Sequence, residues 1–135
     1  MPRLFDVRNV HVSITRPAGE VYTFMSDGQN LGQWATGLGS TYVRDGDSWL
    51  VQGPDGLVRA RLPNPNEFGV VDHTVTLPTG VTAYIPIRVI PNGDGSTVTV
   101  TLLRRDGVSD QQFDADAQWV SRDLATLKSV LEGRR

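Results

Sequence analysis

Cysteine is absent from the 135-residue chain, and histidine occurs only twice. Without cysteine the protein has no disulfide framework, no thiolate nucleophile, no cysteine-ligated zinc and no iron–sulfur cluster. His11 and His73 fall on different expected strands and on opposite faces, so they do not form the clustered ligand set of a metal site. We therefore expect neither a metal nor another cofactor.

An excess of one charge is also missing. The chain has 13 basic and 15 acidic residues and a net charge of −2. The basic residues are spread along the chain apart from the pairs Arg104-Arg105 and Arg134-Arg135, whereas a nucleic-acid-binding protein concentrates them on one face. We predict that nucleic acid is not a partner.

Long hydrophobic runs are lacking as well. No apolar stretch approaches the roughly 18 residues of a membrane helix, and Met1 to Val10 has no apolar core of a secretory signal. We therefore expect no membrane insertion and a cytoplasmic location. The length suits one domain over residues 1–135, large enough to bury a core of its own.

The N-terminal part predicts one strand and two short helices. Val10–Ile14 alternates apolar and polar residues, which is typical of a half-buried strand. Pro17 suits the first position of a helix, and the apolar residues after it recur at helical spacing. Asn30 can cap a second short helix that contains Trp34.

Six further strands are predicted in the middle of the chain. Short turns rich in glycine, proline, asparagine and aspartate separate them, which indicates antiparallel hairpins. With the first strand they make seven. The six ranges are Ser40–Arg44, Ser48–Gln52, Leu57–Leu62, Phe68–Thr76, Val81–Ile90 and Thr97–Leu103.

A long amphipathic helix closes the chain. Ser109 and Gln112 match a capping box, and a single apolar stripe follows as far as about Glu132. One helix cannot cover a strongly twisted seven-stranded sheet, so we expect the sheet to curl around it and the short helices to close one end. This α+β arrangement, a helix-grip fold, leaves a cavity between the sheet and the helix.

Strand alternation predicts which side chains face that cavity. Inward-facing positions include Val71, Ile85, Ile87 and Val100 on the strands, with Val120 and Leu124 on the helix. Asp72 is predicted to point outward, where it forms a cross-strand charge ladder with Arg59, Arg61 and Arg88.

His73 is the only titratable residue that this pattern places inside. A buried histidine is expected to have a hydrogen-bond partner, and a backbone carbonyl, Tyr42 or Tyr22 could supply it. Alternatively, His73 anchors a ligand carbonyl or hydroxyl, or acts as a general acid or base. In each case burial should lower the pKa of the imidazole and keep it neutral.

Three tryptophans leave alternatives open. Trp34 either seals the end of the core or forms a wall of the cavity entrance. Trp119 lies beside the stripe of the closing helix, where it packs against a sheet edge or lines the cavity. Trp49 has the same two interpretations.

Several stretches carry a resemblance to a known family; they are His11–Thr15, Pro17–Val21, Asn30–Trp34, Gly69–His73, Pro86–Gly95, Trp119-Val120 and Asp123-Leu124. With the order of elements, they resemble the START/Bet v 1-like (SRPBCC) superfamily, in particular its polyketide cyclase/dehydrase-like branch. The resemblance implies a helix-grip fold and a hydrophobic ligand. It does not choose an activity, because the superfamily includes cyclases, lipid carriers, hormone receptors and co-chaperones.

Three functions remain open on these grounds. The first is binding of a small hydrophobic or aromatic ligand, with His73, Trp34, Trp119, Val71, Ile85, Ile87, Val100, Val120 and Leu124 as site residues. The second is a cyclase- or dehydratase-like enzyme with His73 as acid or base. The third is a domain with a filled interior that acts through its surface or a dimer interface. The chain is expected to be a monomer or a homodimer.

Overall fold

The computed structural model describes residues 2–37, 39 and 41–134. It confirms an α+β architecture in which a long C-terminal helix packs on antiparallel sheet. The elements, in order, are β1 (Val7–Ile14), α1 (Ala18–Ser26), a 3-10 turn (Gly28–Asn30), α2 (Leu31–Trp34), β2 (Tyr42–Asp45), β3 (Ser48–Gly53), β4 (Gly56–Arg61), β5 (His73–Thr76), β6 (Thr82–Ile85), β7 (Ile87–Asn92), β8 (Gly95–Leu103) and α3 (Asp110–Glu132).

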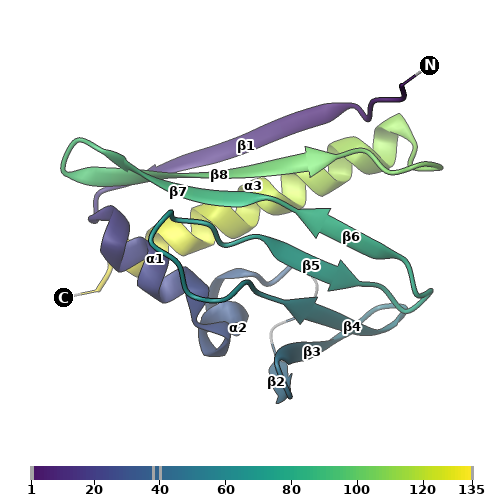
Figure 1. Ribbon diagram of the computed structural model, residues 1–135, viewed down its shortest axis with the longest axis horizontal. Helices are drawn as coiled ribbons and strands as arrows, with labels where there is room; N and C mark the ends of the chain where they lie inside the picture. Colours follow the sequence, from purple (N-terminus) through teal and green to yellow (C-terminus); the bar gives the residue numbers. More distant parts are fainter. Residues whose placement is uncertain (1, 38, 40, 135) are drawn as a thin grey trace.

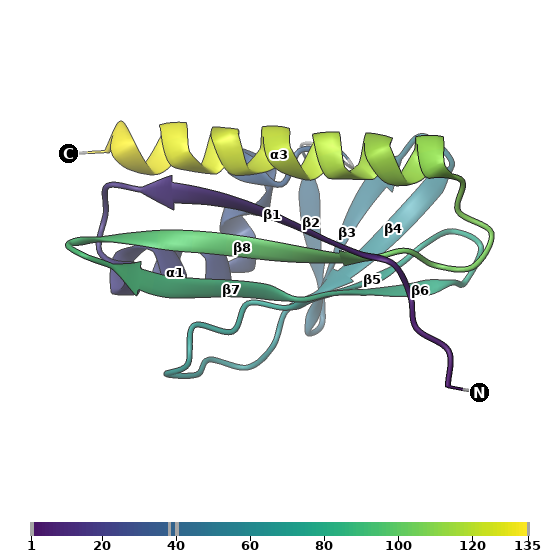
Figure 2. The ribbon, with the colours of Figure 1, turned by 90° about the horizontal axis from the view of Figure 1, so that it is seen from above.

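The strands form two sheets rather than one. The first has the order β1-β8-β7 and the second the order β2-β3-β4-β5-β6, and all pairs are antiparallel. Figure 1 shows α3 behind the first sheet, and Figure 2 shows β2, β3 and β4 splaying away from that sheet. The expected curl around the helix is therefore divided between two sheets.

The division explains why the prediction of seven strands was wrong and eight are described. The predicted strand Val81–Ile90 is interrupted at Pro86, which has no N–H to donate to a ladder. β6 pairs with β5 before this residue, and β7 pairs with β8 after it. The Pro86 carbonyl still accepts a hydrogen bond from Thr101 N at 2.9 Å. The chain therefore stays bonded to β8 at the point where it passes from one sheet to the other.

The predicted strand Phe68–Thr76 is also shorter than expected and begins only at His73. The Asn66 side chain accepts hydrogen bonds from Phe68 N and Val70 N, at 3.0 and 3.1 Å, and holds a loop there instead. Gly69 has a φ of +71°, which glycine adopts without strain. The predicted start of another strand, Ser40, lies outside the described residues.

Of the predicted helix starts only that of α3 is confirmed, because Pro17 lies one residue before α1 and the Asn30 side chain does not cap α2. Ser109 Oγ accepts a hydrogen bond from Gln112 N at 3.0 Å, which caps α3, although the Gln112 side chain bonds Asp116 at 2.8 Å instead of completing the capping box. The C-terminal half of α3 packs with α1 and the first sheet into a continuous core. The N-terminal half of α3 faces the second sheet, and a cavity lies between them. Among the described residues no helix is long and apolar enough to cross a membrane.

Candidate functional site

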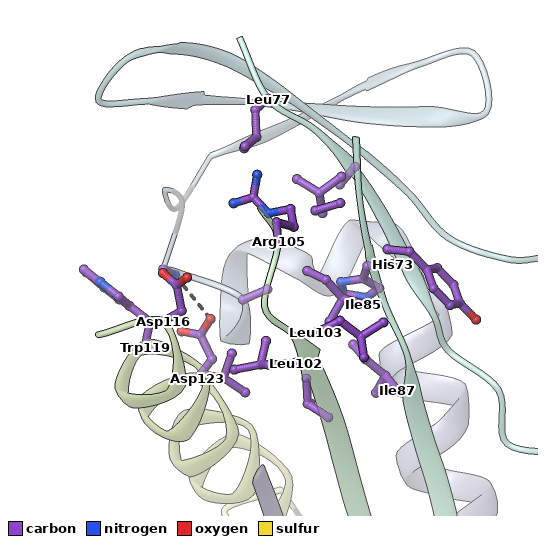
Figure 3. A pocket seen from close by; sticks show the side chains of 18 of the residues that line it. His73, Leu77, Ile85, Ile87, Leu102, Leu103, Arg105, Asp116, Trp119 and Asp123 are labelled. Carbon is purple, nitrogen blue, oxygen red and sulfur yellow. Dashed lines mark hydrogen bonds between the residues drawn. The ribbon is translucent and has the colours of Figure 1, made fainter. Parts of the chain in front are cut away.

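A cavity of about 700 Å³ lies between α2, the first half of α3 and the strands β4 to β8. Figure 3 shows side chains from the sheet and from α3 converging on it. Binding sites for small molecules usually have volumes of about 300–1,000 Å³ and mostly apolar walls with a few polar groups. The cavity has the size and composition of such a site.

Most of the predicted site residues lie in the wall of this cavity. The apolar ones are Ile85, Ile87, Val100, Val120 and Leu124. Val71 is an exception, because it is fully buried in the core and does not reach the cavity. Since β5 begins at His73, Val71 lies before the part of the strand that faces the cavity, and its N–H bonds Ile87 O at 2.9 Å.

His73 is the first residue of β5, opposite Ile85 of β6, and its ring faces the cavity. The side chain is buried, with 8% exposure. Its Nε2 atom has no hydrogen-bond partner among the described residues. The expected partners are engaged elsewhere, since Tyr42 donates to Ala35 O at 2.6 Å and Tyr22 accepts from Asn66 N at 2.7 Å.

Burial lowers the pKa of His73 from 6.5 to about 4, against a smaller opposing effect of Asp72. The imidazole is therefore neutral at pH 7, as the sequence predicts. A neutral imidazole has one donor and one acceptor nitrogen, so Nε2 can serve a ligand in either way.

Asp72 points outward as predicted, but the predicted charge ladder is only partly correct. Its carboxylate accepts hydrogen bonds from Ile87 N at 2.8 Å, from Tyr84 Oη and from the Arg88 guanidinium. Arg59 and Arg61 pair with aspartates of the β2–β3 hairpin instead, at 2.9 and 3.0 Å. Asp72 thus ties β5 to the crossing point between the sheets, one residue before His73.

Trp34 lies at the end of α2 and combines both predicted roles. It is buried, with 3% exposure, packs in the core and lines the cavity. Its ring lies beside that of His73, with centroids 5.8 Å apart and an interplanar angle of 48°. Trp34 Nε1 is also buried without a hydrogen-bond partner among the described residues.

The other two tryptophans differ from each other. Trp119 projects from α3, lines the cavity and is 46% exposed, with the Arg122 guanidinium 5.1 Å from its ring centroid. Trp49 lies elsewhere and packs on Gly28, where a Cβ atom would fall 2.0 Å from Trp49 Nε1. Trp119 is therefore available to a ligand, and Trp49 has a structural role.

Five charged residues of the wall were not predicted: Asp55, Arg104 and Arg105, and, on α3, the two aspartates Asp116 and Asp123. The two aspartates project from α3 near Trp119 in Figure 3. They lie seven residues apart and beside the apolar stripe, so the helical period could have revealed them. Arg105 follows β8 in a loop, where no periodic pattern indicates the direction of a side chain.

Asp123 connects α3 to the loop after α2. Its carboxylate accepts hydrogen bonds from Gly37 N and Thr36 Oγ1, both at 3.4 Å. Burial raises the pKa of Asp123 to about 6, against smaller effects of these hydrogen bonds. Burial and the charge of Asp123 raise the pKa of Tyr42 to about 12. Among the described residues no group of three acidic or histidine side chains could hold a metal ion.

Neither a family model nor a curated protein sequence matches the chain. Solved structures do match it over most of its length. XoxI from Bacillus cereus is 15% identical, with a TM-score of 0.72 over 92% of this chain and 94% of its own. Ara h 8.0201 is 13% identical, with a TM-score of 0.73 over 96% and 99%.

A third similar structure is DynU16, described as a protein in the dynemicin biosynthetic locus. It is 19% identical, with a TM-score of 0.71, over 97% of this chain but only 48% of its own. At such identities the likeness concerns the fold alone. These neighbours and the described topology agree on one architecture, and the chain has the helix-grip fold of the START/Bet v 1-like superfamily.

Proposed function

We propose that the protein binds a small, mainly apolar ligand that carries a hydroxyl or carbonyl group. The observation that carries this proposal is that two residues of one cavity wall, Trp34 and His73, each hold a buried atom, Nε1 and Nε2, without a hydrogen-bond partner among the described residues. A buried polar group without a partner costs about 1–3 kcal/mol. A ligand oxygen that bonds these atoms would remove that cost, while the rest of the ligand covers the apolar wall.

The chemistry of the two groups defines the kind of oxygen that fits. Indole N–H is a donor only, whereas neutral imidazole can donate or accept. A hydroxyl group, which both donates and accepts, can satisfy the two together. A carbonyl oxygen can do so when both nitrogens carry protons. An apolar molecule without oxygen would fill the cavity but leave both atoms unsatisfied.

The cyclase- or dehydratase-like alternative has less support from this geometry. A general acid or base works best with a pKa near the operating pH, and the pKa of His73 is about 4. The indole N–H of Trp34, whose ring lies beside that of His73, does not exchange a proton in this range. The third alternative, a filled interior, requires a cavity far smaller than the 700 Å³ present.

The cavity is tested with N-phenyl-1-naphthylamine, an uncharged dye that fluoresces in apolar sites. Ala83→Phe adds a ring inside the cavity, and Ala125→Phe adds the same ring on the exposed face of α3. We expect saturable binding to the wild type and to Ala125→Phe, with a loss of at least about tenfold in Ala83→Phe. Equal binding to all three would place the dye elsewhere and contradict the proposal.

The polar anchors are tested by comparing 1-naphthol with 1-methylnaphthalene, which has a methyl group in place of the hydroxyl. We expect the preference for naphthol to fall about tenfold in His73→Leu. A tenfold change in affinity corresponds to about 1.4 kcal/mol, which is the contribution of one hydrogen bond between uncharged groups. Trp34→Phe should reduce the same preference. If both variants keep the full preference, the anchors are not these residues.

A further inference from the structure

Arg105 is one of two arginines in the cavity wall, and it has no partner in the part of the chain that the structure describes. It follows β8 in the loop to α3, and it is only partly exposed. Within residues 2–37, 39 and 41–134, its side chain forms no hydrogen bond, ion pair or cation–π contact. In Figure 3 the guanidinium is turned into the cavity, on the side of Leu77.

The neighbouring Arg104 shows that the lack of partners is specific to Arg105. Arg104 also lies on the cavity wall, but its Nε donates to Val108 O at 2.8 Å and its Nη1 pairs with Asp110 and, at 3.5 Å, with Asp6. Its backbone N–H bonds Asp6 O at 2.9 Å. Arg104 is therefore committed to holding the loop in place.

The backbone of Arg105, like that of Arg104, is held by a hydrogen bond. Its carbonyl accepts a hydrogen bond from Val108 N at 3.2 Å, which closes a tight turn. Gly107 occupies the third position of the turn with a φ of +81°, the conformation that a type II turn requires there. The side chain therefore projects from a fixed position, and a ligand that meets it does not have to order the loop.

The cavity wall also holds three carboxylates, those of Asp55, Asp116 and Asp123, and none of them pairs with Arg105. Asp116 accepts a hydrogen bond from Gln112 Nε2 at 2.8 Å, and Asp123 accepts those from Thr36 and Gly37. Neither lies within ion-pair distance of Arg105. A guanidinium removed from part of its water without a counter-charge costs free energy, and an anionic ligand group would offset this cost.

We propose that the ligand is an amphipathic acid, whose carboxylate or sulfonate group pairs with the Arg105 guanidinium while its apolar body fills the cavity. This inference rests on the proposed function, because it names the ligand class of the same site. Arginine suits the role, since its planar fork binds a two-oxygen anion through two parallel hydrogen bonds. His73 and Trp34 would hold a second oxygen on the same molecule.

The test uses two dyes that differ by one charged group. 8-Anilino-1-naphthalenesulfonate is N-phenyl-1-naphthylamine with a sulfonate added to the naphthalene ring. We expect Arg105→Gln to weaken the sulfonate dye about tenfold, in the range of one hydrogen bond between charged groups, and to change binding of the neutral dye less than twofold. Arg105→Lys should keep part of the affinity for the sulfonate.

Arg61→Gln is the matched control, because it removes the same charge from the outer face of β4, away from the cavity. It should leave both dyes unchanged. Sodium chloride should weaken the sulfonate dye in the wild type more than in Arg105→Gln, since an ion pair at a partly exposed site is screened. Thermal unfolding of each variant shows that the fold is intact.

The outcomes separate the two proposals. If the neutral dye does not bind the wild type in the cavity, the proposed function fails and this inference fails with it. If the neutral dye binds but Arg105→Gln leaves the sulfonate dye unaffected, or weakens both dyes equally, only the acidic ligand is ruled out. A cationic naphthalene that binds better than the sulfonate would equally overturn it.

Discussion

At position 73 an imidazole stands where the neighbouring inward-facing residues of the sheet are aliphatic. The strand alternation that buries Val75 also buries His73, and burial then keeps the imidazole neutral by lowering its pKa to about 4. The same residue thus gives the apolar cavity a polar atom without a charge. Trp34 adds a second one, because its ring packs in the core while its N–H remains without a partner among the described residues.

The first prediction at this scale is a pH dependence of stability due to His73. The folded pKa lies below the unfolded value of 6.5, so the unfolded state binds more protons between pH 6.5 and 4. The free energy of unfolding is therefore highest above pH 6.5, where His73 is neutral in both states, and it decreases as the pH falls from 6.5 toward 4. The decrease amounts to about 3 kcal/mol.

Urea unfolding of His73→Leu at a series of pH values checks this prediction. The variant should lose much less stability than the wild type between pH 7 and pH 4. His11→Asn, on the exposed face of β1, serves as the control and should follow the wild type. Parallel curves for His73→Leu and the wild type would show that the imidazole is not buried as described.

A second prediction concerns Asp123, whose pKa is raised by burial whereas that of His73 is lowered. Since burial raises the pKa of Asp123 from 3.8 to about 6, its contribution to stability is lost as the pH rises through this range. Asp123→Asn removes that loss and keeps an oxygen that can accept from Gly37. We expect the free energy of unfolding at pH 7 to rise by about 1 kcal/mol, after a discount for partial exposure. A decrease at pH 7 in urea unfolding would mean that the hydrogen bonds to Thr36 and Gly37 require the charge.

Among the elements, α3 is the one whose start is set most clearly by a local interaction. Its first turn is capped by Ser109, its N-terminal half lines the cavity, and its C-terminal half completes the core. One amphipathic stripe therefore serves both purposes. Which part of the stripe lines the cavity and which part packs in the core depends on the distance from α3 to the facing sheet, and not on the sequence of the helix.

The third prediction is that Ser109→Ala destabilises the protein through this helix. Loss of the cap leaves the Gln112 N–H without its 3.0 Å hydrogen bond, at a cost of about 1 kcal/mol. Ser129→Ala, on an exposed face near the other end of α3, should be neutral or slightly stabilising because alanine favours helix. Equal stabilities of the two variants in urea unfolding would show that the cap contributes nothing.

For the whole molecule, the arrangement in two sheets decides where the interior is solid and where it is hollow. The three-stranded sheet packs closely with α1 and the end of α3. The five-stranded sheet has a separate small cluster around Val51, Val58 and Val75, and it faces the first half of α3 across the cavity. A ligand in the cavity would therefore complete the packing of the second sheet.

The fourth prediction concerns the amide hydrogen exchange of the protein with and without a ligand. A ligand present at about 100 times its Kd adds about 2.7 kcal/mol of stability. We expect N-phenyl-1-naphthylamine to slow exchange most in β5, β6 and α2, whose residues contact the cavity. Amides of β1 should change least among the strands. Protection confined to β1 would indicate a binding site outside the cavity.

Sequence patterns alone determined the order and type of the elements apart from the division of Val81–Ile90 into two strands, and they determined the cap at Ser109 and the inward direction of His73. These follow from hydrophobic periodicity and local hydrogen bonding, which act within one strand or one turn of helix. The interruption at Pro86 could also have been noticed, because proline cannot donate to a ladder. The loop around Asn66 depended on side-chain contacts that no period reveals.

Only the tertiary structure decided which residues meet. The contact of Trp34 with His73 joins residues 39 positions apart by number, from α2 and β5, and the place of Arg105 depends on a loop held by Asp6 at the other end of the chain. The exclusion of Val71 from the cavity depends on where β5 begins. Periodicity reports which face of an element is buried, whereas the curl of the sheets decides whether that face meets a packed core or a cavity.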